Sequence, residues 1–276
     1  MKKNTIKLAI YSIVMAIASS CGTDSPLNDP AAMVKPDALL LKRNVVADST
    51  EIIEAAGERT YVKISWPEIL PPENLVARNI NGAIQRDILE MIASVNPPLT
   101  ADKVMMPADI NAAAKSFIQS YRVASTEYEE GTPWHLVAYV DTVYAGKTIL
   151  TFMMGTSTYT GGMHSYIGDY CLHFDPKTGK QISIMEFFRD STSLSTALEA
   201  KFRQMYKLAP GQDMIEGNLL EDYTGRFPIT SEMYFDDNKL VAIYNPYDIQ
   251  PFSEGQIIIE LSNEEYIPLM KKPVKP

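Results

Sequence analysis

Residues 134–159 read WHLVAYVDTVYAGKTILTFMMGTSTY. Two long runs, Trp134–Tyr144 and Lys147–Tyr159, flank the dipeptide Ala145-Gly146 and are rich in β-branched and aromatic residues. Such residues favour strands, and a short break that contains glycine is typical of the connection in a β-hairpin. The pattern therefore predicts a hairpin of two long antiparallel strands in the middle of the chain.

The residues that follow the hairpin predict more strands and few helices. Ser165–Asp175 is expected to form a third strand, and Asp175–Gly179 to turn the chain, because Asp, Pro and Gly favour turns. Helices are expected over about Thr192–Leu208 and, near the end of the chain, about Asn263–Met270. Further strands are expected near Met233–Phe235, Leu240–Tyr244 and Gln256–Leu261.

The residues before the hairpin mix both types of element. Two extended segments are expected between Val45 and Trp66 around a turn at Gly57, and a second helix from about Pro107 to Tyr121. Apolar residues at every fourth position predict an amphipathic helix before it. Because strands and helices do not alternate regularly, the sequence predicts an α+β fold of mainly antiparallel sheets with packed helices. The apolar series is Val76, Ile80, Ile84, Ile88 and Ile92.

The first residues have the order of a secretory signal. Basic residues precede an apolar run, Leu8–Ala18, which is too short to span a bilayer as a helix. Ala18–Cys21 resembles the bacterial lipoprotein box, with Ala18 where that box usually has Leu. We therefore expect residues 1–20 to be cleaved and Cys21 to carry lipid. The alternative is an ordinary signal peptide with a coincidental cysteine.

Lipidation would place the chain outside the cytoplasm, on the periplasmic or cell-surface side of a bacterial membrane, with membrane contact through the lipid alone. Residues 21–41 contain Pro26, Pro30 and Pro36 without a hydrophobic period, which favours a flexible tether. With Cys21 acylated, Cys171 would have no partner for a disulfide in this chain.

The chain is acidic. It holds 25 basic and 34 acidic residues, a formal net charge of −9. Residues 1–20 hold three of the basic residues and no acidic one, so cleavage would leave 22 basic and 34 acidic residues, a net charge of −12. This charge repels nucleic acid and accelerates the encounter with a cationic protein, although solubility alone also accounts for it. We expect no nucleic-acid partner.

Three clusters stand out in the second half of the chain: Gly161–His164 (GGMH), Phe174–Lys180 (FDPKTGK) and Asn245–Gly255 (NPYDIQPFSEG). Their order and spacing resemble the extracytoplasmic domain of RsiV-type anti-sigma factors. The region from about Thr60 to Tyr121 resembles the small domain that usually precedes it and that also occurs in the peptidoglycan deacetylase PdaC. The resemblance divides the chain into two closely associated modules, residues 42–125 and residues 126–276. Departures from the family pattern include Met163 for Ala and Phe252 for Tyr.

The resemblance implies a module that recognises a ligand at the cell envelope, since the RsiV-type domain binds lysozyme as a signal. Our leading hypothesis is a non-enzymatic envelope lipoprotein whose ligand is a lysozyme-like cationic protein or peptidoglycan. A structural role in envelope assembly is an alternative. A cell-wall hydrolase, with His164 and Asp169 as the residues to test, is another. No nucleophile motif is present, and we expect no cofactor.

The candidate binding residues are Gly161, Gly162, His164, Tyr247 and Phe252. Paired glycines permit positive φ, which suits either a tight turn or a cradle for a ligand. A loop histidine can act as a base, but it can also bond to nearby backbone. The aromatic residues lie in a proline-stiffened loop that could contact a glycan or a protein, and core packing also fits.

Asp169, Cys171 and His173 alternate along the expected third strand and so share one face. This pattern is compatible with a metal site. However, strand neighbours two residues apart lie ~6.6 Å from each other, which is awkward for adjacent ligands of a tetrahedral ion. We therefore expect no metal here, but a buried thiol and a partly solvated histidine.

Overall fold

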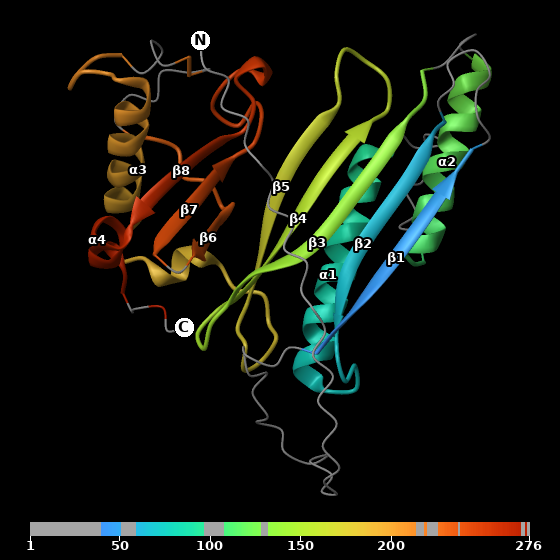
Figure 1. The fold of residues 1–276 in the computed structure, drawn as a ribbon, viewed down its shortest axis with the longest axis horizontal. Helices are drawn as coiled ribbons and strands as arrows, with labels where there is room; N and C mark the ends of the chain where they lie inside the picture. The colour runs from blue at the N-terminus through green and yellow to red at the C-terminus, as the bar shows by residue number, and fades with distance from the viewer. Residues whose placement is uncertain are drawn as a thin grey trace, which may run out of the picture. The chain divides into compact units, whose positions relative to one another are not determined.

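The computed structural model describes residues 40–50, 59–96, 108–127, 132–213, 218–219, 226–236, 238–271 and 274. These residues form an α+β fold with two sheets, as the sequence predicts (Figure 1). All of them belong to one compact unit. The expected signal peptide, Cys21 and the turn at Gly57 lie outside the described residues.

The larger sheet has five strands in the order of the sequence, β1-β2-β3-β4-β5. The central hairpin is confirmed, because β3 and β4 pair antiparallel and β5 continues the meander. One pairing was not predicted: β2 and β3 run parallel, so the chain must cross over between them. The strands are β1 Leu41–Ser49, β2 Tyr61–Ile69, β3 His135–Ala145, β4 Leu150–Tyr159 and β5 Tyr166–Phe174.

The crossover contains the two helices that cover one face of this sheet, α1 (Leu75–Val95) and α2 (Ile110–Glu127) (Figure 1). Asn74 caps the N-terminus of α1, because its side chain accepts hydrogen bonds from two backbone N–H groups of the first turn. The predicted apolar series is confirmed as its buried face. Together with the covered face of the sheet, the helices form the first hydrophobic core.

The smaller sheet has three antiparallel strands, β6 (Met233–Asp236), β7 (Lys239–Tyr244) and β8 (Ile257–Ser262). Helix α3 (Ser191–Tyr206) packs its apolar residues Leu194, Leu198 and Phe202 into a second core with these strands. The shorter elements are η2 Ile184–Phe187, η4 Phe252–Glu254, α4 Asn263–Tyr266 and η5 Ile267–Leu269.

The central hairpin takes part in both cores. The body of β3 and β4 packs in the first core, whereas Ile149, next to the hairpin turn, is fully buried in the second. Tyr144 at the same end of the hairpin makes an edge-to-face contact with Phe235 of β6, with ring centroids 6.3 Å apart. The second core therefore depends on residues from the larger sheet.

The predicted boundary between residues 125 and 126 falls between β2 and β3, which are hydrogen-bonded neighbours in one sheet. The division of the chain into two modules stays a prediction. No helix in the described part of the chain is long and apolar enough to cross a membrane.

Candidate functional site

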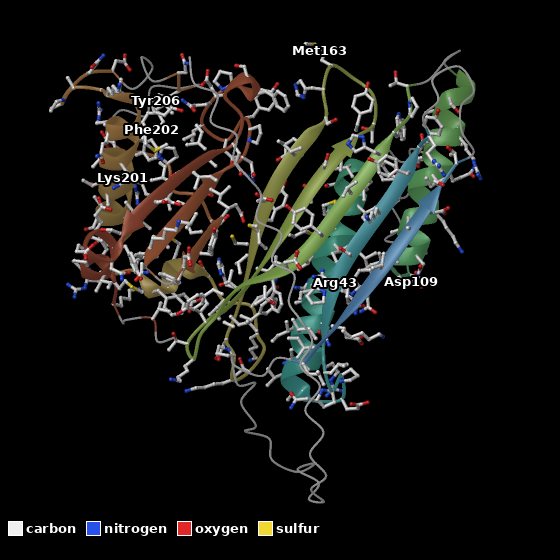
Figure 2. The ribbon with its side chains drawn as sticks, viewed as in Figure 1. Arg43, Asp109, Met163, Lys201, Phe202 and Tyr206 are labelled. Atoms are coloured by element: carbon white, nitrogen blue, oxygen red, sulfur yellow. The ribbon has the colours of Figure 1, made fainter. Side chains whose placement is uncertain are left out.

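The connection between β4 and β5 is a turn built on glycine. Gly161 and Gly162 have φ angles of +99° and +109°, a region that side chains disfavour, so the turn requires glycine at these positions. The Tyr159 hydroxyl donates a hydrogen bond to the Gly162 carbonyl over 3.0 Å. The next residue, Met163, is 97% exposed at the tip of this connection (Figure 2).

The second part of the site is the segment 245–255, which connects β7 to β8. It is held by local hydrogen bonds: Asn245 N–H donates to the Asp248 carboxylate over 2.7 Å, and Tyr247 N–H donates to the Gln250 carbonyl over 3.1 Å. Tyr247 adopts a φ of +73°, unusual for a residue with a side chain, and is 52% exposed. The turn thus holds an aromatic ring in solvent.

The two connections meet in a cluster of three rings, His164, Tyr247 and Phe252, here called the ring cluster. His164 stacks on Phe252 with centroids 3.6 Å apart and planes 12° from parallel. Its Nε2 lies 3.1 Å from the Tyr247 hydroxyl, and the Tyr247 and Phe252 centroids are 5.8 Å apart. The structure therefore brings together three of the five predicted binding residues, and places Gly161 and Gly162 in the turn that presents His164.

Both ring nitrogens of His164 have a hydrogen-bonding partner. Nδ1 lies 3.3 Å from the Ser165 carbonyl oxygen, which can only accept. Nε2 lies 3.1 Å from the Tyr247 hydroxyl, which can donate or accept. The ring cluster is an aromatic surface with a hydrogen-bonding edge, suited to contact with a ligand.

The pair proposed for a hydrolase is not hydrogen-bonded in the described structure. The Asp169 carboxylate accepts from the Gln256 side chain over 3.0 Å, whereas His164 bonds to Ser165 and Tyr247. The geometry thus gives His164 no carboxylate to orient it as a base.

Side chains that flank the strands of the smaller sheet bond to part of the free edge of β5. The Asn245 side chain accepts from Asp169 N–H over 2.8 Å and donates to the Asp169 carbonyl over 3.0 Å, as a neighbouring strand would. Glu232 accepts from Cys171 N–H. These contacts join β5 to the smaller sheet and fix the ring cluster at that junction.

A cavity of about 330 Å³ lies at this junction, and Asn245, Asp248 and Ile249 of the segment that carries Tyr247 and Phe252 line part of it. Tyr166, Tyr170, Glu232 and Asp248 line it. Burial raises the pKa of both carboxyl groups above the ordinary range. Among the described residues neither carboxylate forms an ion pair, so the cavity is acidic.

Cys171 and His173, which share one face of β5, differ in how deeply they are buried. His173 is only 6% exposed, so the expectation of a partly solvated histidine was wrong: the β5 end of the sheet is covered there. Cys171 is a free cysteine and only partly buried. In the part of the chain that the structure describes, no three His, Cys, Asp or Glu side chains are grouped to hold a metal ion.

Residues 186–264 match a family described as a protein of unknown function, DUF3298. This segment contains Tyr247 and Phe252 but not His164. No curated protein is significantly similar to the chain in sequence.

Two crystal structures of DUF3298 proteins have a similar fold. The protein from Pseudomonas aeruginosa PAO1 has a TM-score of 0.61 and 15% sequence identity, over 86% of this chain and 96% of that one. The protein from Bacteroides fragilis NCTC 9343 has a TM-score of 0.62 and 15% identity, over 85% of this chain and 95% of that one. At this identity the similarity establishes the fold alone.

Sequence reasoning missed the polar residues that join β5 to the smaller sheet, Glu232, Asn245 and Gln256. Asn245 precedes a proline, and this pattern indicates only a turn. Its burial, at 4% exposure, comes from a strand edge 76 residues earlier in the chain. No local pattern carries that information.

Proposed function

We propose that this chain is an exported, lipid-anchored and non-enzymatic envelope protein that binds a cationic protein, with a lysozyme-like protein as the candidate. The ring cluster carries the proposal, because it joins connections 83 residues apart into one exposed surface beside Met163. Exposed aromatic residues and methionine are typical of protein-binding surfaces. The resemblance to RsiV-type domains and to the small domain of PdaC supports the same class of function.

The charge of the molecule supports a cationic ligand. The chain has a net charge of −9, and the cavity next to the ring cluster contains Glu232 and Asp248 without ion-pair partners among the described residues. A Lys or Arg side chain entering the cavity would form ion pairs with these carboxylates, of which Glu232 is half-buried and Asp248 is exposed. Contact with the ring cluster would then provide most of the affinity, and the negative charge would accelerate association with a cationic protein.

The test is titration calorimetry of lysozyme with the parent chain and two variants. Tyr247→Asn removes the ring, and asparagine tolerates positive φ better than most residues, so the turn is retained. We expect a loss of affinity of roughly 30-fold, as for an interface residue that contributes about 2 kcal/mol. Tyr61→Asn is the control, because Tyr61 is also exposed but lies on β2.

The calorimetry is repeated at low and moderate salt, where the proposal requires weaker binding as salt rises. If lysozyme bound the Tyr247 and Tyr61 variants saturably and with equal affinity, the ring cluster would not be its binding site. If lysozyme produced no heat of binding and was not inhibited, lysozyme would be excluded as the ligand.

The anchor is tested by labelling cells with radioactive palmitate. The parent chain should incorporate the label, and Cys21→Ser should lose it completely, because the acyl chains enter through that thiol. Cys171→Ser is the matched control and should keep the label. A labelled Cys21→Ser chain would contradict the proposed lipid anchor.

A further inference from the structure

A cavity of about 760 Å³ lies at the end of the larger sheet where β1 ends and where β2 and β3 begin. Its volume is within the range of sites that bind small molecules. None of the described residues that line it belongs to the ring cluster. The cavity is therefore a separate feature of the molecule.

Strand β2 presents a cation, an aromatic ring and a second cation to this cavity. Arg59, Tyr61 and Lys63 are exposed and line the cavity. Thr60 and Val62 between them are buried, at 0% and 2% exposure. This alternation is that of a strand, so the three exposed side chains share one face, with about 6.6 Å between successive members. The ring thus lies between two positive charges.

The two faces of the Tyr61 ring have different neighbours. Toward β3 it stacks on His135, with centroids 5.8 Å apart and planes 18° from parallel. His135 in turn stacks on Tyr159, and its Nε2 lies 3.1 Å from the Ser157 hydroxyl. Toward β1 the residue directly opposite Tyr61 is Ser49, whose small side chain leaves room beside the ring. The second face of the ring therefore borders the cavity.

The lining is positive although the chain is acidic. Arg59 and Lys63 form no ion pair among the described residues. Asp48 also lines the cavity, but it lies opposite Val62 and so belongs to the other face of the sheet. A positive cavity on a chain of net charge −9 favours a ligand with negative charge.

We propose that this cavity binds an acidic saccharide, with a sugar ring packed on Tyr61 and carboxylates bound by Arg59 and Lys63. The C–H groups of a sugar ring are apolar and pack on an aromatic face. The guanidinium group matches the geometry of a carboxylate, and the ammonium group adds a second charge.

The arrangement of the charges favours a saccharide over a nucleotide. The cations lie on both sides of the ring along β2, as the repeating charges of an acidic saccharide chain require. The phosphates of a nucleotide, in contrast, lie on one side of its base. This site goes beyond the proposed function and does not depend on the binding of lysozyme.

The test is titration calorimetry of the full chain, with Cys21→Ser to prevent acylation, purified in detergent. The acidic probe is a tetrasaccharide of alternating N-acetylglucosamine and N-acetylmuramic acid. Chitotetraose, which contains N-acetylglucosamine alone, lacks the lactyl carboxylates, so the comparison isolates the charge. We expect saturable binding of the acidic probe at millimolar or lower concentration, weaker binding of chitotetraose, and a loss of this difference at high salt.

Variants in this background test the ring and the charges separately. Tyr61→Asn should weaken the binding of both probes by about 10-fold, whereas Tyr61→Phe keeps the ring and should bind as the parent does. Combined Arg59→Gln and Lys63→Gln should weaken binding of the acidic probe by roughly 10-fold and leave chitotetraose unchanged. Lys147→Gln is the control, because Lys147 is also exposed but lies in the turn between β3 and β4.

Circular dichroism checks that each variant is folded. If Tyr61→Asn does not fold, saturation-transfer NMR of the parent decides the matter, because irradiated aromatic protons should pass saturation to the sugar C–H protons. The proposal is overturned by absence of that transfer, by absence of saturable binding of the acidic probe, by equal affinity for chitotetraose, by unchanged affinity of Tyr61→Asn, or by tighter binding of ADP. Lysozyme binding by Tyr61→Asn should be unchanged, so this proposal and the proposed function fail independently.

Discussion

Gly179→Ala is expected to lower the free energy of unfolding by about 3 kcal/mol or more. Gly179 has a φ of +67°, which costs a residue with a side chain about 1 kcal/mol. An added Cβ would also lie 2.4 Å from the Val76 carbonyl oxygen in the first turn of α1. Relieving such an overlap with backbone typically costs a further ~1–3 kcal/mol.

Gly211→Ala separates these two contributions. Gly211 has a similar φ of +77°, but an added Cβ there meets no atom within 4 Å. Denaturant unfolding should show a loss of about 1 kcal/mol for this variant. If both variants lost the same free energy of unfolding, the turn at Gly179 would be able to move away from α1 at little energetic cost.

Asn245→Ala is expected to lower the free energy of unfolding by roughly 2–4 kcal/mol. The substitution removes the donor and the acceptor that satisfy Asp169 N–H and C=O. Each buried backbone group left unpaired costs about 1–3 kcal/mol. The Gln256 side chain, which donates to both Asn245 and Asp169, would lose one of its acceptors as well.

Asn79→Ala provides the comparison in the same denaturant experiment. The Asn79 side chain also donates to a backbone carbonyl, that of Thr178, over 2.9 Å, but this contact is exposed. Water can replace it, so we expect a loss below about 1 kcal/mol. A loss for Asn245→Ala no larger than this would show that water also reaches the β5 edge.

The sequence predicted the elements whose side chains follow a period. The run 134–159 gave the hairpin, and apolar residues at every fourth position gave the buried face of α1. In these segments one face is buried, and that burial determines both the spacing of apolar residues in the sequence and the type of element. The α+β class followed from the order of the elements and is confirmed.

The pairing of elements could not be predicted in the same way. Alternating burial identifies β2 as a strand, but it does not show which strand pairs with β2 or whether the two run parallel. The parallel pairing of β2 with β3 was therefore not predicted. The ring cluster and the burial of His173 likewise depend on residues distant in sequence. For the candidate site, the sequence supplied the residues and the fold supplied their arrangement.

The position of Ile149 has a consequence for how the molecule opens. Ile149 is buried in the second core, whereas the strands of its hairpin, β3 and β4, pack in the first, so the second core cannot open without exposing a residue of that hairpin. Regions that share buried residues in this way lose their amide protection together. Hydrogen exchange should therefore find the two sheets in one cooperative unit, in which a ligand bound at either sheet stabilises both.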